Sequence, residues 1–331
     1  MPRATSIPIA LTIAGSDSGG GAGIQADLKT FHAFGVFGTS ALTAITAQNT
    51  LGVSAVHPVP IDVVRAQIHA VASDLRPAAF KTGMLATRAI IDAVADAIVA
   101  EGLRRYVLDP VMVATSGDRL LDRDAERAIV ERLLPLCAVA TPNLPEALVL
   151  LGEADDPAAF DEAALRERAR RLVELGAPAV LLKGGHLAGP EVIDVLFDGS
   201  EFRVWRRPRL DTTSTHGTGC TLSAAIAAGL ALGQPLLGAT DRALRFVARA
   251  IEAAPGLGSG HEVAQGAVKR SVPSTPRSAR MPSAVMSAWI AAIRSCGARC
   301  DDVQPPPAPA ACCSAISAAR CSRNCAMPSG R

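Results

Sequence analysis

Several features that would place the chain in other protein classes are missing from the sequence. Nowhere do 18 uncharged apolar residues follow one another, so we expect no membrane span. The apolar stretch after Arg3 leads into residues 15–17 without a cleavage site, and we therefore expect a cytoplasmic protein. Cysteine is scarce in residues 1–261, which contain only Cys137 and Cys220, so a disulfide framework is excluded there.

Two nucleotide-binding signatures are also missing. No Gly-Lys-Ser/Thr sequence occurs, so the chain has no Walker-type phosphate loop. Residues 21–26 match the loose dinucleotide fingerprint, but no ribose-binding acid ends the following strand-like segment, 40–49, which weakens a hydride-transfer interpretation. What remains is a loop that lets backbone approach a ligand closely. Asp27 would then be a polar contact, or an acid that favours the start of the next helix.

The composition is that of a globular protein. Of 331 residues, 49% are hydrophobic and 19% are charged, which suits one large α/β domain or two smaller ones. The net charge of +2 is unevenly distributed, because residues 262–331 contain nine Lys and Arg and only three acidic residues. Because this segment is rich in Ser, Pro, Ala and Cys, we expect a folded domain over 1–261 and a divergent, disordered extension over 262–331. The spacing of Cys296/Cys300 and Cys321/Cys325 leaves a zinc module as the alternative.

Strand-like and helix-like segments alternate through residues 1–261, which predicts a mostly parallel sheet covered by helices on both faces. The expected strands are 9–14, 39–47, 79–82, 106–108, 138–141 and 179–182. The expected helices are 24–34, 61–75, 87–101, 122–134, 145–151, 161–175, 218–232 and 240–253. Segments 192–197 and 201–205, joined by Asp-Gly-Ser, predict an antiparallel hairpin at the sheet edge.

The turn before the expected helix 218–232 has the features of an anion site. Gly217 and Gly219 lack Cβ atoms, so successive backbone N–H groups, including that of Thr218, can converge where the positive end of the helix begins. Cys220 lies in the first helical turn, where the helix field favours a thiolate. The alternatives are an ordinary glycine-containing turn and a small buried cysteine.

Polar residues follow three of the expected strands: Asp109, then Asn143 with Glu146, then Lys183. We expect them to converge, because ligands of such sheets lie beyond the carboxyl ends of the strands. Hard oxygen ligands suit Mg²⁺ and a lysine offsets phosphate charge, so together these residues favour phosphoryl transfer. Taken singly, Glu146 also suits a first-turn helix acid, and Asp109 suits a turn before Pro110.

These residues belong to a series of motifs with a family resemblance. The motifs are AGSDSGGGAGIQAD at 14–27, AQNT at 47–50, KTGML at 81–85, LDPVM at 108–112, TPNLPEA at 141–147, KGGH at 183–186 and HGTGC at 216–220. In this order, over about residues 7–261, they resemble the hydroxymethylpyrimidine/phosphomethylpyrimidine kinases of thiamine biosynthesis, a branch of the ribokinase-like superfamily. The resemblance implies a three-layer α/β/α fold, usually dimeric. It also implies ATP-dependent phosphorylation of 4-amino-5-hydroxymethyl-2-methylpyrimidine and then of its monophosphate.

Carried over by position, the resemblance implies that Gly15, Asp27, Gln48 and Met84 surround the pyrimidine. Gln48 offers a donor and an acceptor to an aminopyrimidine edge, and Met84 supplies a polarizable apolar face. The alternatives are that Gln48 only ties loop backbone and that Met84 only fills the core.

The remaining implied roles concern the phosphoryl group. Cys220 would take the proton of the substrate hydroxyl, while the N–H groups of Gly217, Thr218 and Gly219 stabilise the transferring phosphoryl group. The resemblance further implies nucleotide contacts by Lys183, Thr212 and His216. Asp109, Asn143 and Glu146 would hold Mg²⁺.

Three other functions stay open. A pyridoxal/pyridoxine kinase of the same superfamily would share the mechanism and differ in the ring pocket. A second possibility is a non-catalytic ligand-binding protein with this fold. The third is nucleic-acid binding through the basic segment 262–331. We expect the first-named kinase activity, in a homodimer with no membrane or nucleic-acid partner.

Overall fold

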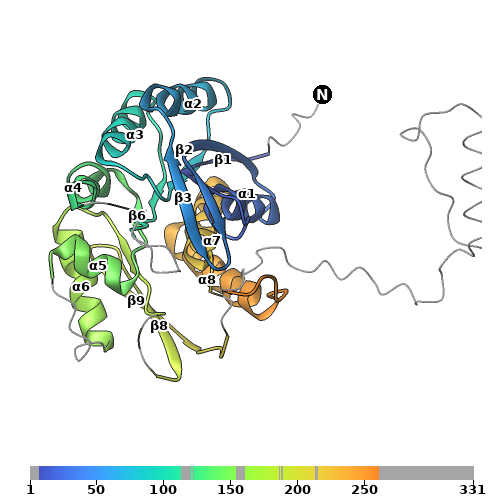
Figure 1. Ribbon diagram of the computed structural model, residues 1–331. Helices are drawn as coiled ribbons and strands as arrows, with labels where there is room; N and C mark the ends of the chain where they lie inside the picture. The colour runs from blue at the N-terminus through green and yellow to red at the C-terminus, as the bar shows by residue number, and fades with distance from the viewer. Residues whose placement is uncertain are drawn as a thin grey trace, which may run out of the picture. The chain divides into compact units, whose positions relative to one another are not determined.

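A mixed sheet forms the centre of the fold (Figure 1). The computed structural model describes residues 7–112, 121, 123–153, 161–185, 187, 189–212 and 215–260. Its strands are β1 (Ile9–Asp17), β2 (Phe37–Asn49), β3 (Gly52–Pro58), β4 (Ala79–Thr82), β5 (Tyr106–Leu108), β6 (Val139–Ala140), β7 (Val180–Leu182), β8 (Glu191–Phe197) and β9 (Phe202–Pro208). They lie in the order β3-β2-β1-β4-β5-β6-β7-β8-β9. The run from β2 to β7 is parallel, whereas β3, β8 and β9 pair antiparallel with their neighbours.

Helices cover both faces of this sheet. One layer holds α1 (Gly23–Ala33), α7 (Thr218–Ala231) and α8 (Leu236–Glu252). The other holds α2 (Ile61–Asp74), α3 (Arg88–Ala100), α4 (Arg123–Ala128), α5 (Leu144–Leu151) and α6 (Glu162–Glu174). Figure 1 shows these two groups on opposite sides of the strands. The three-layer α/β/α prediction is therefore confirmed.

The core explains why the central strands are apolar without alternation. In β1, Leu11 and Ile13 join the cluster under α2 to α6, while Ala10 joins the opposite cluster, which includes Phe31 of α1. Thr12, between Leu11 and Ile13, is also buried, and its hydroxyl is paired with Asp27. A strand buried on both faces needs side chains that are apolar or hydrogen-bonded. Helix α7 is buried from Thr221 to Ala231, and a Cβ on Gly229 would lie 2.7 Å from Ala239 Cβ of α8. Small residues thus allow α7 to sit close to its neighbours, which fixes its N-terminus relative to the strands.

The predicted hairpin is confirmed as β8 and β9, but three elements differ from expectation. Strand β3 was not expected; most of its residues are exposed, and it pairs with β2 alone, so no buried pattern marks it. The expected helix 122–134 is α4 followed by a π-helical turn over 129–133 and a 3₁₀ turn over 134–136, which contains Pro135. Helix α8 begins four residues early because Pro235 supports the start, and Gly238 does not interrupt it.

Some predictions fall outside what the structure describes. The segment 262–331, with its proposed zinc cysteines, lies outside the described residues, as does His186. Among the residues that are described, no helix combines the length and apolar character needed to cross a membrane.

Candidate active site

A cavity of about 470 Å³ lies where the parallel strands end and α7 begins. Its walls come from Asp17 of β1, Gln48 of β2, and the residues that follow β4, β5, β6 and β7. This volume is in the range of small-molecule sites, about 300–1,000 Å³. The carboxyl-end position is the one that open parallel sheets use for ligands.

The structure brings nearly all of the predicted site residues to this cavity. Its lining includes Gly15, Gln48, Met84, Asp109, Asn143, Glu146, Lys183, His216, Gly217, Thr218, Gly219 and Cys220. Two predicted residues, Asp27 and Thr212, do not line it. The convergence expected from strand order alone therefore occurs.

The start of α7 has the backbone geometry that an anion site requires. Gly217 precedes the helix with φ of 76°, and Thr218 bonds back to the Thr215 carbonyl. Within the described part of the chain, the N–H groups of Gly219 and Cys220 have no hydrogen-bond acceptor, as is usual for a first helical turn. Two N–H donors and the helix dipole are therefore available to a phosphate group.

The first glycine loop is organised around a carboxylate of the protein itself. Asp17 accepts hydrogen bonds from the N–H groups of Gly19 at 2.8 Å, Gly21 at 3.0 Å and Ala22 at 2.8 Å. Because these donors are already paired, the loop shapes the cavity wall rather than offering a second phosphate site. Sequence reasoning assigned Asp17 no role, although an aspartate before a Ser-Gly-Gly run is typical of side-chain-capped turns.

Asp17 also joins the two glycine segments. Its Oδ2 atom lies 3.1 Å from Nε2 of His216, and both side chains are buried. Burial alone raises the pKa of Asp17, but the hydrogen bonds from His216 and the loop amides outweigh burial and hold the pKa below its usual value. His216, predicted as a nucleotide contact, is thus tied to the first glycine loop while it lines the cavity.

Asp27 occupies a different place from the predicted one. Its carboxylate is fully buried, accepts a 2.6 Å hydrogen bond from Thr12 Oγ1 and lies 3.2 Å from Nζ of Lys81. It is the fifth residue of α1, too far along to act as a first-turn acid. The cause is Lys81, a buried cation that must be paired. Asp27 therefore supports the cavity floor instead of lining the cavity.

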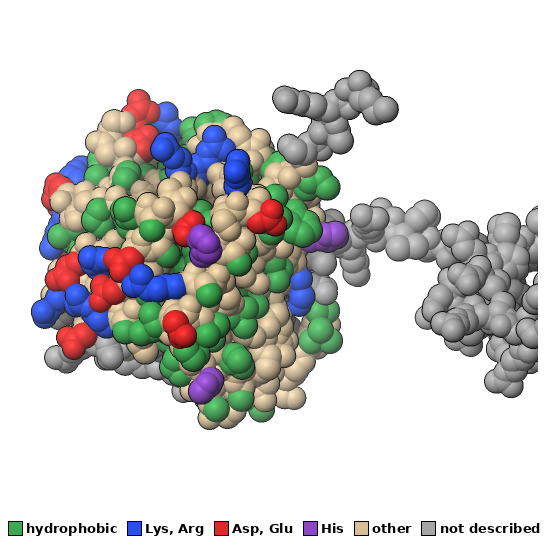
Figure 2. Space-filling model, turned by 90° about the horizontal axis from the view of Figure 1, so that it is seen from above, with side chains coloured by type: hydrophobic (Ala, Val, Ile, Leu, Met, Phe, Trp, Pro, Cys, Tyr) green, Lys and Arg blue, Asp and Glu red, His purple; other side chains and the backbone are tan. Residues whose placement is uncertain are grey.

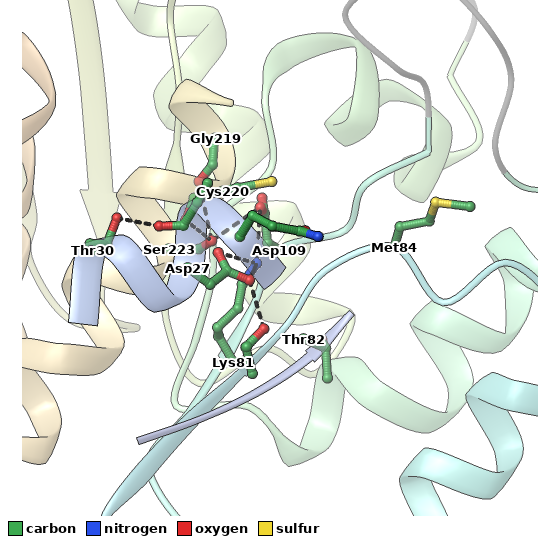
Figure 3. Close-up of polar contacts among 12 residues, drawn as sticks. Asp27, Thr30, Lys81, Thr82, Met84, Asp109, Gly219, Cys220 and Ser223 are labelled. Atoms are coloured by element: carbon green, nitrogen blue, oxygen red, sulfur yellow. Dashed lines mark hydrogen bonds and ion pairs between the residues drawn. The ribbon is translucent and has the colours of Figure 1, made fainter. Parts of the chain in front are cut away.

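Lys81 is the functional candidate that sequence reasoning missed. Burial lowers its pKa, but the carboxylates of Asp27 and Asp109 raise it more, so Lys81 is held as a cation. Its Nζ lies 4.0 Å from Asp109 Oδ2. Figure 3 shows Asp27, Lys81 and Asp109 together beneath Cys220, with Met84 apart from them. A lysine inside an apolar strand was the available signal, since lysine is almost never fully buried without a partner.

The expectation of a Cys220 thiolate is wrong for the ligand-free protein. Burial raises the pKa of the thiol to about 12, and Asp27 and Asp109 add to this effect. Lys81 and a hydrogen bond from the Gly23 N–H act in the opposite direction without cancelling it. At neutral pH the side chain is therefore a thiol that faces the cavity.

The predicted metal ligands surround Lys183. Its Nζ lies 3.2 Å from Asp109 Oδ1 and 3.7 Å from Glu146 Oε2. Asn143 and Glu146 also form a capping box at the start of α5, with backbone-to-side-chain bonds of 2.8 and 2.7 Å. Burial raises the pKa of Glu146 to about 7, although Lys183 opposes the rise.

No preformed metal cage results from this arrangement. In the described ranges, no three His, Cys, Asp or Glu side chains are grouped to hold a metal ion. Mg²⁺ commonly takes one or two carboxylates and completes its shell with water and phosphate oxygens. Asp109 and Glu146 therefore fit an ion that is bound together with a polyphosphate.

The fold and this cavity place the chain in the class of small-molecule phosphotransferases. The chain belongs to the phosphomethylpyrimidine kinase family, whose family model matches residues 17–265. A relative from Rhizobium meliloti, named hydroxymethylpyrimidine/phosphomethylpyrimidine kinase, is 55% identical over 258 residues, covering 78% of this chain and 94% of the relative. The Bacillus subtilis protein of the same name is 49% identical, covering 77% and 93%.

Solved structures agree with this family. Phosphomethylpyrimidine kinase from Clostridium difficile superposes with a TM-score of 0.65 at 40% identity, covering 74% of this chain and 99% of that one. An ADP complex of Bacillus subtilis pyridoxal kinase gives a TM-score of 0.71 at 39% identity, covering 78% and 98%. The architecture is thus common to kinases of both substrate names.

The contact between the two glycine segments predicts a severe effect of Gly217→Ala. A Cβ there would lie 1.9 Å from the Gly21 carbonyl oxygen. We expect turnover to fall about 100-fold, the size of loss that follows removal of one oriented anion donor, because the α7 N–H groups would shift. Gly233→Ala is the control, since it has φ of 81° but no atom within 4 Å. Equal turnover in the two variants would contradict the prediction.

The role of Asp17 predicts that Asp17→Asn destabilises the fold by about 1–3 kcal/mol at neutral pH, because buried donors lose their acceptor. A depressed pKa contributes stability above the unfolded value of 3.8, and this stability is lost as pH falls through the folded value. The difference from wild type should therefore shrink below about pH 4. Urea unfolding at neutral pH and below about pH 4 measures this difference in the free energy of unfolding. Asp62→Asn, at an exposed position, is the control. A difference that is constant with pH would refute the assignment.

Proposed function

We propose that this chain transfers the γ-phosphoryl group of ATP to the hydroxymethyl group of 4-amino-5-hydroxymethyl-2-methylpyrimidine, and then phosphorylates the monophosphate. One observation carries the proposal: a single cavity joins the open N–H groups of α7 to Gln48 and Met84. The family and its similarly named relatives support the same substrate.

The pyrimidine end of the cavity suits a small flat ring. Gln48 can donate to and accept from an aminopyrimidine edge. A Cβ on Gly15 would lie 3.3 Å from Met84 Sδ, so glycine lets Met84 pack beside it and present its thioether to a ring. The Thr43 hydroxyl donates a 2.6 Å hydrogen bond to the Met84 carbonyl and fixes this segment.

The phosphate end supplies charge and orientation. Lys183 and the N–H groups of Gly219 and Cys220 would hold the transferring phosphoryl group, and Cys220, in its thiolate form, would accept the proton of the attacking hydroxyl. Asp109 and Glu146 would hold Mg²⁺, which neutralises phosphate charge when it is bound. Asn143 contributes by capping α5, which keeps Glu146 in place. Thr212 remains a proposed nucleotide contact on the resemblance alone.

The wider proposal keeps residues 1–261 as the kinase domain and 262–331 as an extension. It also keeps a cytoplasmic homodimer that does not use nucleic acid. On the face shown in Figure 2, acidic and basic side chains are interspersed, which does not favour a polyanion. Exposed pairs such as Arg65–Asp96 and Arg132–Asp96 have this mixed character.

A substrate comparison tests the proposal against pyridoxal kinase activity, which several structural neighbours carry in their names. We expect kcat/KM to be at least about tenfold higher for the pyrimidine than for pyridoxal, because Gln48 pairs with the amino-substituted ring edge. In Cys220→Ala, most turnover should be lost while calorimetry still detects pyrimidine binding. A preference for pyridoxal would favour the other kinase, and binding without turnover in wild type would favour a non-catalytic role.

The protonated thiol predicts a specific pH profile. Below a pKa of about 12, the thiolate fraction of the ligand-free protein rises tenfold with each pH unit, so kcat/KM should rise about tenfold per unit between about pH 7 and 9. Cys220→Ala should lose this slope. Cys137→Ala is the matched control, because Cys137 is a buried cysteine, its pKa is also raised to about 12, and it lies away from the cavity. A flat wild-type profile would mean that Cys220 acts without losing its proton.

A further inference from the structure

We propose that residues 258–260, which follow α8, form a clasp that positions the β2–β3 turn and thereby holds Gln48 ready for the pyrimidine. Gly258 and Thr50 are the positioning residues. The inference rests on the proposed function for its substrate, but its structural part can be tested without turnover. No chemical step is assigned to the clasp.

The clasp is a close backbone contact. The Gly260 N–H donates a 3.3 Å hydrogen bond to Thr50 Oγ1. A Cβ on Gly258 would lie 2.4 Å from Thr50 Oγ1, and a Cβ on Gly260 would lie 2.1 Å from the Thr50 carbonyl oxygen. Gly258 also has φ of 90°. Only glycine at these two positions lets the chain pass so close to the turn.

The turn is closed by its own Asn49 side chain, which accepts hydrogen bonds from the N–H groups of Leu51 at 2.8 Å and Gly52 at 3.3 Å, but these bonds do not tie the turn to a neighbouring element. It joins β2 to the edge strand β3, most of whose residues are exposed, and Leu51 at its tip has 68% of its surface accessible. An edge strand paired along one side opens more readily than a central one. A contact from α8's end therefore adds a restraint that the sheet does not supply.

Thr50 lies only two residues along the chain from Gln48, which lines the cavity. On the opposite side of the turn, the Ser18 hydroxyl donates a 2.6 Å hydrogen bond to the backbone carbonyl of Gln48 and accepts a 2.8 Å hydrogen bond from the backbone N–H of Gln48. A Cβ on Gly19 would lie 3.3 Å from Asn49 Cα. The segment 48–50 thus lies between the first glycine loop and the clasp, and Gln48 lines the cavity. The Gln48 Oε1 atom also accepts a 3.2 Å hydrogen bond from Thr46 Oγ1.

A restraint at this point should affect one substrate more than the other. Gln48 belongs to the pyrimidine end, whereas the N–H groups of α7 and Lys183 belong to the phosphate end. Loosening the turn lowers the fraction of molecules in which Gln48 is correctly placed, and apparent affinity falls by that fraction. The expected signature is a higher KM for the pyrimidine with little change for ATP.

Gly258→Ala tests the clasp, and Gly256→Ala is its matched control. Both glycines have positive φ, of 90° and 68°, but an added Cβ at Gly256 meets no atom within 4 Å. We expect Gly258→Ala to raise the KM for the pyrimidine about five- to tenfold more than Gly256→Ala, with the KM for ATP within about twofold. Equal pyrimidine KM values in the two variants would overturn the proposal.

Thr50 gives a second test if Gly258→Ala does not fold. Thr50→Val removes the acceptor of the Gly260 N–H and keeps the side-chain volume, while Thr50→Ser retains the hydroxyl. We expect Thr50→Val to raise the pyrimidine KM and Thr50→Ser to restore it to within about twofold of wild type. Identical KM values for Val and Ser would count against the clasp.

Amide hydrogen exchange separates failure of the clasp from failure of the proposed function. In Gly258→Ala or Thr50→Val, exchange at residues 47–51 should be about tenfold faster, with exchange in α7 unchanged. If wild type does not phosphorylate the pyrimidine but exchange accelerates in this way, the clasp stands and the substrate assignment fails. Unchanged exchange at 47–51 would overturn the clasp whatever the substrate.

Discussion

The cavity depends on the contact between two glycine segments that are almost 200 residues apart in sequence. Gly217 approaches the Gly21 carbonyl so closely that any side chain would collide, and Asp17 and His216 close the same junction with a buried hydrogen bond. Because Asp17 also holds the loop amides, one carboxylate sets the shape of the first segment and its distance from the second. The N-terminus of α7 lines the same cavity as Gln48 only while this junction holds.

Beneath the junction, charge balance decides which groups can act. Asp27, Lys81, Asp109 and Lys183 form a chain of buried ion pairs with separations of 3.2 to 4.0 Å. Removing one partner from such a chain leaves a buried charge without a counter-charge. This destabilises the fold far more than replacing the whole ion pair by apolar residues would. Burial raises the pKa of Asp109, but Lys183 and, to a smaller extent, Lys81 outweigh burial and keep Asp109 ionised. The inner lysine, Lys81, is enclosed by the fold, whereas the outer lysine, Lys183, lines the cavity.

Much of this arrangement follows from the sequence, and the exceptions share a cause. Strand and helix periodicity predicted the layers, and the position of polar residues after strands predicted the convergence of Asp109, Asn143, Glu146 and Lys183. Strand β3 was not predicted, because an exposed edge strand has no alternation of buried and exposed residues. Asp27 was misplaced because its partner, Lys81, is 54 residues away, and only the register of β1 with β4 brings that strand beside α1. Local patterns do not report long-range charge pairing.

Two opposing effects act on the pKa of Cys220: the field at the start of α7 lowers it and burial raises it. A helix N-terminus stabilises an anion by about 0.3–1 kcal/mol, and up to about 2 in favourable sites. Full burial can move a pKa by about 3–5 pH units, and each unit corresponds to about 1.4 kcal/mol. Cys220 keeps some accessible surface, but even part of that shift outweighs the helix field. The sequence displays the helix but not the burial. A proton acceptor at this position therefore needs help from the buried Lys81 cation and from changes that accompany ligand binding, and the helix alone does not create it.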